Sequence, residues 1–304
     1  MEKIAIVTDS TADIPEEIAE RYHVYTVPIT INLDGESLED GSGGDGNVNR
    51  LSREKFYNQQ LPHLKTFPTT AAPSIGTFQK VYQRVFENGY QHIISIHLAK
   101  ELSGTINSAI LAAREFGDQV NVIDGRQVTL ALGYQVLACA EILKKYKDHN
   151  DDVSSVVAIQ TMIKKMENMR TRLRVVGILD TLEYLKRSGR VSWMQAALGS
   201  LLNLKLMIEV KNGHVDKLGQ ARTKRAGLDR LLEQIKGMGE LEHLAVIHTG
   251  GGAEYEAPEI LETIVSSLQI KPLSQMCIWM TPVLGAHVGP NLIGLTAVAC
   301  DPID

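Results

Sequence analysis

The first half of the chain alternates short apolar runs with helix-like segments, and this alternation limits the fold more than any other feature. Apolar runs at residues 4–7, 92–96 and 120–123 are each followed by a polar loop and then by a segment with helical periodicity. Buried strands that alternate with helices are typical of α/β domains. The pattern therefore predicts an N-terminal α/β domain with a mostly parallel, Rossmann-like sheet.

Two further segments of this half do not follow the alternation of strand and helix. Residues 24–33 are apolar enough to predict one continuous strand. Residues 35–50 are polar and rich in glycine, which predicts a surface loop. No Lys-Ser or Lys-Thr pair follows these glycines, so they do not form a phosphate-binding loop of the Walker type.

The second half mixes hairpins with helices. A strand is predicted over residues 173–179 and a hairpin around Asn212-Gly213, with helices over residues 223–238 and 253–268. The fold class is therefore α/β with two domains, of which the C-terminal one holds a mixed sheet with helices. We expect the N-terminal domain to span residues 1–170, with the polar loop 35–50 inside it, and the C-terminal domain to span residues 171–304.

Near the C-terminus, residues 282–290 contain two prolines and two glycines around His287. Glycine opens backbone angles closed to other residues and proline removes a donor, so we expect a shaped loop between two strands. Such a loop either holds the histidine at a specific place or leaves it in water. Residues 193–204 are strongly apolar, which predicts a helix buried in the core or against a ligand.

Composition narrows the class of protein. The 304 residues are 44% hydrophobic and 22% charged with a net charge of -5, which is ordinary for a globular protein and argues against a nucleic-acid partner. The three cysteines show no metal or redox spacing, so no metal site is expected and a reducing compartment fits. No signal peptide and no apolar run of membrane-spanning length is present, so we expect a cytoplasmic protein without a transmembrane segment.

Several polar residues sit where a ligand or partner could bind. Ser103, Gly104 and Thr105 follow a strand and begin a helix, which suits either a small anion or simple capping. The Thr70 hydroxyl lies in an extended segment and binds either a ligand or only water and local backbone. Arg187 and Arg190 flank a glycine turn, which serves either as a docking point for an acidic partner or as a corner held by local carboxylates.

Four motifs in order along the chain carry a resemblance to a known family. They are the opening Ile4-Ala5-Ile6-Val7-Thr8-Asp9-Ser10-Thr11, then Leu102-Ser103-Gly104-Thr105, then Leu182-Glu183-Tyr184-Leu185-Lys186-Arg187-Ser188-Gly189-Arg190, and last Gly285-Ala286-His287. Together they resemble the DegV family of bacterial fatty acid-binding proteins. The resemblance implies two α/β domains with a long-chain fatty acid between them as ligand, and no cofactor.

The resemblance also implies site residues and a partner. Thr70, Ser103 and His287 would bind the fatty acid carboxylate, and the supporting residues would be Gly104, Thr105, Gly285 and Ala286. In the FakB-type members, the bound acyl carboxylate is presented to an ATP-dependent kinase that makes acyl phosphate for phospholipid synthesis. The chain would then be a lipid-binding carrier subunit and no enzyme by itself. It departs from the family pattern at Ala71, Ala72 and Val288, beside the proposed carboxylate site.

Two other classes stand against this interpretation. A small-molecule hydrolase could use Ser103 and His287, although the sequence supplies no third carboxylate and no Gly-x-Ser-x-Gly motif around Ser103. A dinucleotide-binding domain would suit the opening strand, loop and helix, but Gly-x-Gly-x-x-Gly does not follow Val7.

Overall fold

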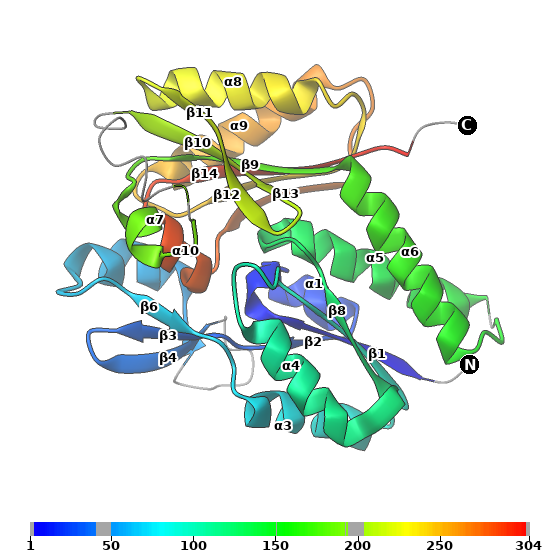
Figure 1. Cartoon of the computed structure of the whole chain (residues 1–304). Coiled ribbons are helices and arrows are strands. Elements are labelled where there is room, and N and C mark those ends of the chain that lie inside the picture. The colour runs from blue at the N-terminus through cyan, green and yellow to red at the C-terminus, as the bar shows by residue number, and fades with distance from the viewer. Residues whose placement is uncertain (1–2, 41–49, 150, 192, 194–203, 302–304) are drawn as a thin grey trace. The chain divides into compact units, whose positions relative to one another are not determined.

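The computed structural model describes residues 3–40, 50–149, 151–191, 193 and 204–301, and it divides into two compact units (Figure 1). Unit 1 consists of Met1–Thr30 and Ala71–Thr171, and unit 2 of Ile31–Thr70 and Arg172–Asp304. The predicted N-terminal domain needs one correction, because the segment Ile31–Thr70 belongs to unit 2. Most of the predicted apolar helix over residues 193–204 lies outside the described residues.

Unit 1 is built on a four-stranded sheet in which every neighbouring pair is parallel. Its strands, in the order β2-β1-β7-β8, are Val24–Val27, Ile4–Asp9, His92–His97 and Val120–Asp124. Ala5 and Val7 point into one core cluster, and Ile4 and Ile6 are buried on the opposite face. This confirms the prediction of a parallel βα sheet in the first half of the chain.

The helices of unit 1 follow from the local sequence. They are α1 (Glu16–Arg21), α3 (Ile75–Glu87), α4 (Thr105–Ala113), α5 (Thr129–Asp148) and α6 (Ser155–Arg172). Helix α3 begins after Ser74, whose hydroxyl accepts a hydrogen bond from the Thr77 amide at 3.1 Å, as an N-cap residue does. Helices α3 and α4 pack apolar side chains onto β1 and β7, including Phe78 and Ala109.

Unit 2 contains a mixed six-stranded sheet. Its strands, in the order β11-β10-β9-β14-β12-β13, are His214–Ala221, Lys205–Lys211, Leu173–Leu179, Ile293–Ala299, Leu241–His248 and Ser274–Trp279. Only the β12–β13 pair is parallel within this sheet. Helices α8 (Lys224–Lys236) and α9 (Ala253–Ser267) cover one face, where Leu231 and Ile264 join the sheet residues in one apolar cluster (Figure 1). The predicted mixed C-terminal sheet is confirmed.

The segment Ile31–Thr70 forms a second, smaller sheet of unit 2. Its strands, in the order β5-β4-β3-β6, are Arg50–Leu51, Glu36–Asp40, Thr30–Leu33 and Thr69–Ala71, and the chain between them holds α2 (Arg53–Lys55) and a π-helical turn, Phe56–Gln60. Two predictions are wrong here. Residues 24–33 form two strands in different sheets, because Pro28 between them has no N–H for a sheet ladder. The predicted loop 35–50 contains β4, although residues 41–49 lie outside the described residues.

None of the helices in the described part of the chain has the length and apolar composition that a membrane span requires.

Candidate functional site

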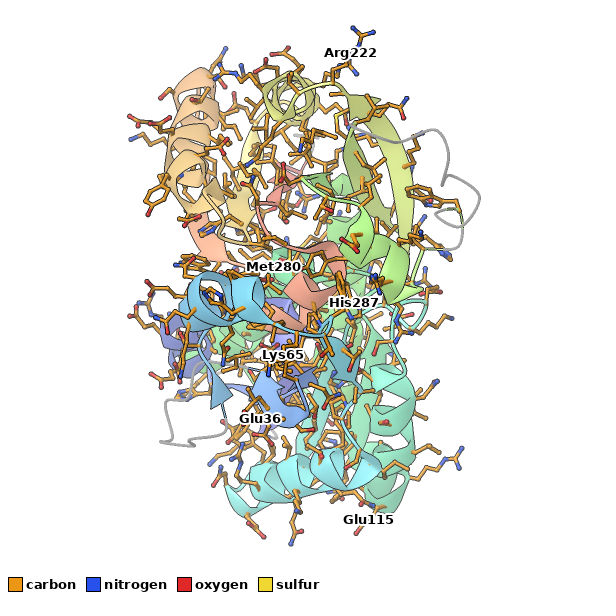
Figure 2. The ribbon with its side chains drawn as sticks, turned by 90° about the vertical axis from the view of Figure 1, so that its left-hand side faces the viewer. Glu36, Lys65, Glu115, Arg222, Met280 and His287 are labelled. Carbon is orange, nitrogen blue, oxygen red and sulfur yellow. The ribbon has the colours of Figure 1, made fainter. Side chains whose placement is uncertain are left out.

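Two of the three predicted carboxylate-binding residues meet within unit 2. Thr70 lies on β6 and His287 lies on the helix α10 (Pro282–Val288), and Thr70 Oγ1 is 2.9 Å from His287 Nε2. The two residues are 217 positions apart in the sequence, so the small sheet brings the Thr70 hydroxyl to the imidazole. Figure 2 shows His287 on α10, with Met280 in the chain that leads into this helix.

The prediction of a shaped loop over residues 282–290 is wrong, because most of it is helical. Pro282 occupies the first turn of α10, where its missing N–H costs nothing and its fixed φ suits a helix. Gly289 ends the helix with φ +79°, and a methyl group there would lie 2.9 Å from Cγ of Tyr184. The prolines and glycines therefore mark the boundaries of a short helix, and this helix fixes the direction in which His287 points.

The imidazole of His287 is neutral at physiological pH. Burial and, to a smaller extent, the nearby positive charge of Arg190 together lower its pKa to about 4. A neutral imidazole has one donor and one acceptor nitrogen. If Nε2–H donates to Oγ1 of Thr70, the Thr70 hydroxyl can donate its own proton to an anion. The pair can thus bind a carboxylate through a neutral hydrogen-bond relay.

Ser103 belongs to unit 1, at the start of α4. Its Oγ lies 2.9 Å from Oγ1 of Thr105 and accepts a hydrogen bond from the Thr105 amide at 3.3 Å. Gly104 is the N-cap residue of α4 and supplies no side-chain cap, so the serine hydroxyl covers one of the free amides. The predicted placement at a helix N-terminus is confirmed, and the role of Ser103 in ligand binding stays a prediction.

The supporting residues of α10 pack tightly. Ala286 is buried, and Gly285 lies against the ring of Tyr57 from the π-helical turn. Tyr57 was not predicted from the sequence. Its hydroxyl donates to the Thr281 carbonyl at 3.2 Å, at the N-cap position of α10.

The basic corner, defined as Arg187 and Arg190, lies at and just after the end of α7 (Glu183–Ser188), which packs against α10. The Arg187 guanidinium lies 4.1 Å from the centre of the Phe67 ring, and it pairs with Glu183 at 3.3 Å. This exposed pair is the local carboxylate contact expected under one of the two interpretations, and pairs of its kind contribute little stability. Arg190 is exposed, yet its charge reaches the imidazole of His287. The corner and the Thr70–His287 pair are therefore neighbours in unit 2.

Unit 1 contains a second histidine cluster that sequence analysis missed. Nδ1 of His97 lies 3.0 Å from Oδ2 of Asp9, Nε2 of His97 lies 2.7 Å from Oγ of Ser95, and Ser95 Oγ lies 2.9 Å from the hydroxyl of Tyr82. All four side chains are fully buried. The order of groups resembles a catalytic triad, but a serine closed off from solvent and bonded to a tyrosine cannot attack a substrate.

The hydrogen bonds of Ser103 and His287 do not support the alternative that the protein is a hydrolase. Ser103 bonds to Thr105 and His287 bonds to Thr70. In the part of the chain that the structure describes, no carboxylate forms a hydrogen bond with the His287 ring. A base of this kind lacks the acidic partner that orients an imidazole in a triad.

Comparisons with known proteins agree with these features. The family model described as "Uncharacterised protein, DegV family" matches residues 3–299. A DegV domain-containing protein from Deinococcus radiodurans is 31% identical over 303 residues, covering 99% of each chain. The chain belongs to the DegV family. A crystal structure of DegV, a fatty acid binding protein from Bacillus subtilis, is similar to it with a TM-score of 0.81 at 29% identity, covering 98% of this chain and 100% of that one.

A stearic acid-binding protein from Eubacterium ventriosum has the same architecture, with a TM-score of 0.80 at 25% identity over 98% of each chain. The DegV fold is thus shared over almost the whole length. Among the described residues of this DegV protein, no group of three or more His, Cys, Asp or Glu side chains could hold a metal ion. Burial raises the pKa of Cys139 to about 12, so its thiol stays protonated.

Proposed function

We propose that this DegV protein binds a long-chain fatty acid and holds its carboxylate at the Thr70–His287 pair. The 2.9 Å contact between Thr70 Oγ1 and the neutral His287 ring is the observation that carries the proposal. The DegV protein of Bacillus subtilis and the relative from Eubacterium ventriosum, which bind fatty acids, support the choice of ligand. Ser103 is proposed as the third carboxylate ligand, on the resemblance of its Leu-Ser-Gly-Thr motif to the family pattern.

The energetics favour a long acyl chain. Each buried CH₂ contributes ~0.8 kcal/mol, so a chain of stearate length offers on the order of 10 kcal/mol before the cost of ordering it. The polar residues then serve mainly to satisfy and orient the carboxylate, which would be costly to bury without donors. That the tail lies between the two domains stays a prediction.

The first experiment compares two neighbouring threonines on β6. Thr70→Val removes the hydroxyl beside His287 and keeps a β-branched side chain, whereas Thr69→Val removes an exposed hydroxyl that bonds to Asn32. Loss of a hydroxyl donor to the carboxylate should weaken stearate binding by about 1–3 kcal/mol for Thr70→Val, and Ser103→Ala should cost a similar amount. Thr69→Val should bind as wild type does. Isothermal titration with stearate measures all three variants.

The identity of the ligand is tested separately. Mass spectrometry of solvent extracts should detect a fatty acid in the protein as purified. If no fatty acid is extracted and neither added stearate nor added oleate binds, the proposal is wrong.

We further propose that the protein presents the carboxylate to an ATP-dependent fatty acid kinase, as FakB-type members do, and that it has no catalytic activity by itself. The packing of the basic corner's helix α7 against α10 supports a docking role for this corner beside the carboxylate-binding pair. Its exposed cations suit an acidic partner surface. A cytoplasmic location also stays a prediction.

Charge reversal tests the docking role. Arg187→Glu combined with Arg190→Gln should leave stearate affinity within about threefold of wild type, since neither residue is a proposed carboxylate ligand and no negative charge is placed beside His287. Acyl phosphate formation with the cognate kinase should be lost. Arg225→Glu, on an exposed site of α8, is the matched control. Normal kinase activity of the double variant would rule out the docking role.

A further inference from the structure

Three side chains from the segment Ile31–Thr70 hold the residues that lead into α10. The Arg53 guanidinium donates to the Trp279 carbonyl at 2.5 Å. The Tyr57 hydroxyl donates to the Thr281 carbonyl at 3.2 Å, and the Thr281 hydroxyl donates to the Asp40 carboxylate. The start of the helix is thus fixed through backbone as well as side-chain atoms.

Tyr57 also occupies the space next to Gly285. A methyl group at Gly285 would overlap the Tyr57 hydroxyl and would lie 2.6 Å from Cζ and 2.8 Å from Cε1 of the ring. The ring itself cannot easily move aside, because two aromatic side chains pack against it. The Trp279 ring stacks on it with 5.8 Å between the ring centroids, and the Phe56 ring packs edge-on with 4.9 Å between the centroids. Only a residue without a side chain fits at position 285.

The geometry of the helix connects this contact with His287. Thr281 and Gly285 are four positions apart, so both face Tyr57. His287 lies two positions further on, which turns it by roughly 200° to the other side of the helix, where Thr70 is found. A shift or rotation of α10 at Gly285 would therefore carry the imidazole away from the Thr70 hydroxyl.

We infer that Tyr57 and Gly285 are a matched pair that sets the position of α10, and that Tyr57 is a positioning residue for carboxylate recognition by His287 and Thr70. The role in recognition rests on the proposed function. The π-helical turn Phe56–Gln60 that carries Tyr57 is consistent with this role, because π-turns occur preferentially at functional sites.

The test is a double-mutant cycle of Gly285→Ala and Tyr57→Leu. Two quantities are measured, the pKa of the His287 ring by NMR in ligand-free protein and the dissociation constant for stearate. Gly285→Ala should raise the His287 pKa from about 4 toward its ordinary 6.5, because displacement of α10 opens the ring to water. The overpacking should weaken stearate binding about tenfold or more.

In the Tyr57→Leu background, adding Gly285→Ala should change the dissociation constant by less than about threefold, because the overlapping ring is gone. Gly76→Ala in α3 is the matched control, since its nearest neighbour would be 3.8 Å away, and it should change neither quantity. His287→Gln identifies the His287 resonance. If Gly285→Ala prevents folding, recovery of the fold by Tyr57→Leu supports the pairing, and no recovery overturns it.

Two results contradict the inference. One is a Gly285→Ala protein with the wild-type His287 pKa and stearate affinity, and the other is an equal loss with and without the Tyr57 ring. A wild-type protein that binds no fatty acid, while Gly285→Ala still raises the His287 pKa, would reject the proposed ligand and leave the positioning of α10 by Tyr57 standing.

Discussion

The two histidine clusters of the molecule use the same residue type in opposite ways. In unit 1, both ring nitrogens of His97 are engaged, one by Asp9 and the other by Ser95, and the ring has no exposed surface. In unit 2, His287 is partly buried, and within the described residues one of its nitrogens has a hydrogen-bond partner, Thr70. The hydrogen bonds of His97 are complete, whereas the His287–Thr70 pair can form a further hydrogen bond to another group.

The partners of each ring explain the difference. Asp9 accepts hydrogen bonds from the Thr11 amide and hydroxyl and from the Leu98 amide, in addition to its contact with His97. Its carboxylate thereby joins the end of β1 to the chain that leaves β7. His287 has a positive neighbour, Arg190, in place of an acidic one. A satisfied buried network stabilises a fold, whereas an imidazole near one positive charge and without a carboxylate partner is suited to receive an anion.

The largest expected effect comes from breaking the complete cluster. Asp9→Ala leaves His97 and the other donors without their acceptor in a site closed to water, so the free energy of unfolding should fall by about 3–5 kcal/mol. Urea denaturation followed by circular dichroism measures the loss. Asp34→Ala is the control, because its exposed carboxylate accepts hydrogen bonds from the Lys65 and Thr66 amides and the Thr66 hydroxyl. Equal losses in both variants would mean that burial of the cluster adds nothing.

The second effect is the pH dependence contributed by His287. Because its pKa is about 4 in the folded protein and 6.5 ordinarily, the unfolded chain binds more protons between these values. The contribution of His287 to the free energy of unfolding is therefore complete above pH 6.5. As the pH falls from 6.5 toward 4, this contribution decreases by on the order of 3 kcal/mol.

His287→Gln should remove this contribution. The difference in unfolding free energy between His287→Gln and wild type should change by the same amount across the interval, and exposed His63→Gln should leave the wild-type slope intact. Parallel curves for wild type and His287→Gln would show that the imidazole is not excluded from water in solution.

The two clusters also show how much of the structure can be predicted from the sequence. Strands such as β1, β7 and β9 follow from apolar runs, and the β10–β11 hairpin follows from Asn212-Gly213. Thr70 and His287 follow from the resemblance to the DegV family. The helix α10 does not follow, because proline and glycine are typical of loops and are equally favoured at the two ends of a helix, where Pro282 and Gly289 lie. The helix is packed at Gly285 by Tyr57 and at Gly289 by Tyr184, and both tyrosines come from distant parts of the chain.

The cluster around His97 was missed for a different reason. Ser95 and His97 lie two positions apart on β7 and so share a face, which is visible in the sequence. Asp9 reaches them only because β1 and β7 pair in parallel with Thr8 opposite Ile96. That register depends on the packing of the whole sheet. The membership of Ile31–Thr70 in unit 2 likewise depends on long-range contacts, since the polar, glycine-rich pattern of residues 35–50 predicts a surface loop and does not show which unit the segment joins.

The smallest expected effect tests where the complete cluster ends. Tyr82→Phe removes only the last hydroxyl of the chain, 2.9 Å from Ser95, and keeps the ring in the core beside Phe78. Ser95 keeps its bond to His97, so the free energy of unfolding should fall by about 1 kcal/mol. Tyr25→Phe is the control, because the hydrogen bond that its hydroxyl accepts from Asn88 lies at the surface, where water can replace it. If Tyr82→Phe were as stable as wild type, the cluster would end at Ser95, and the contrast with His287 would rest on Asp9 alone.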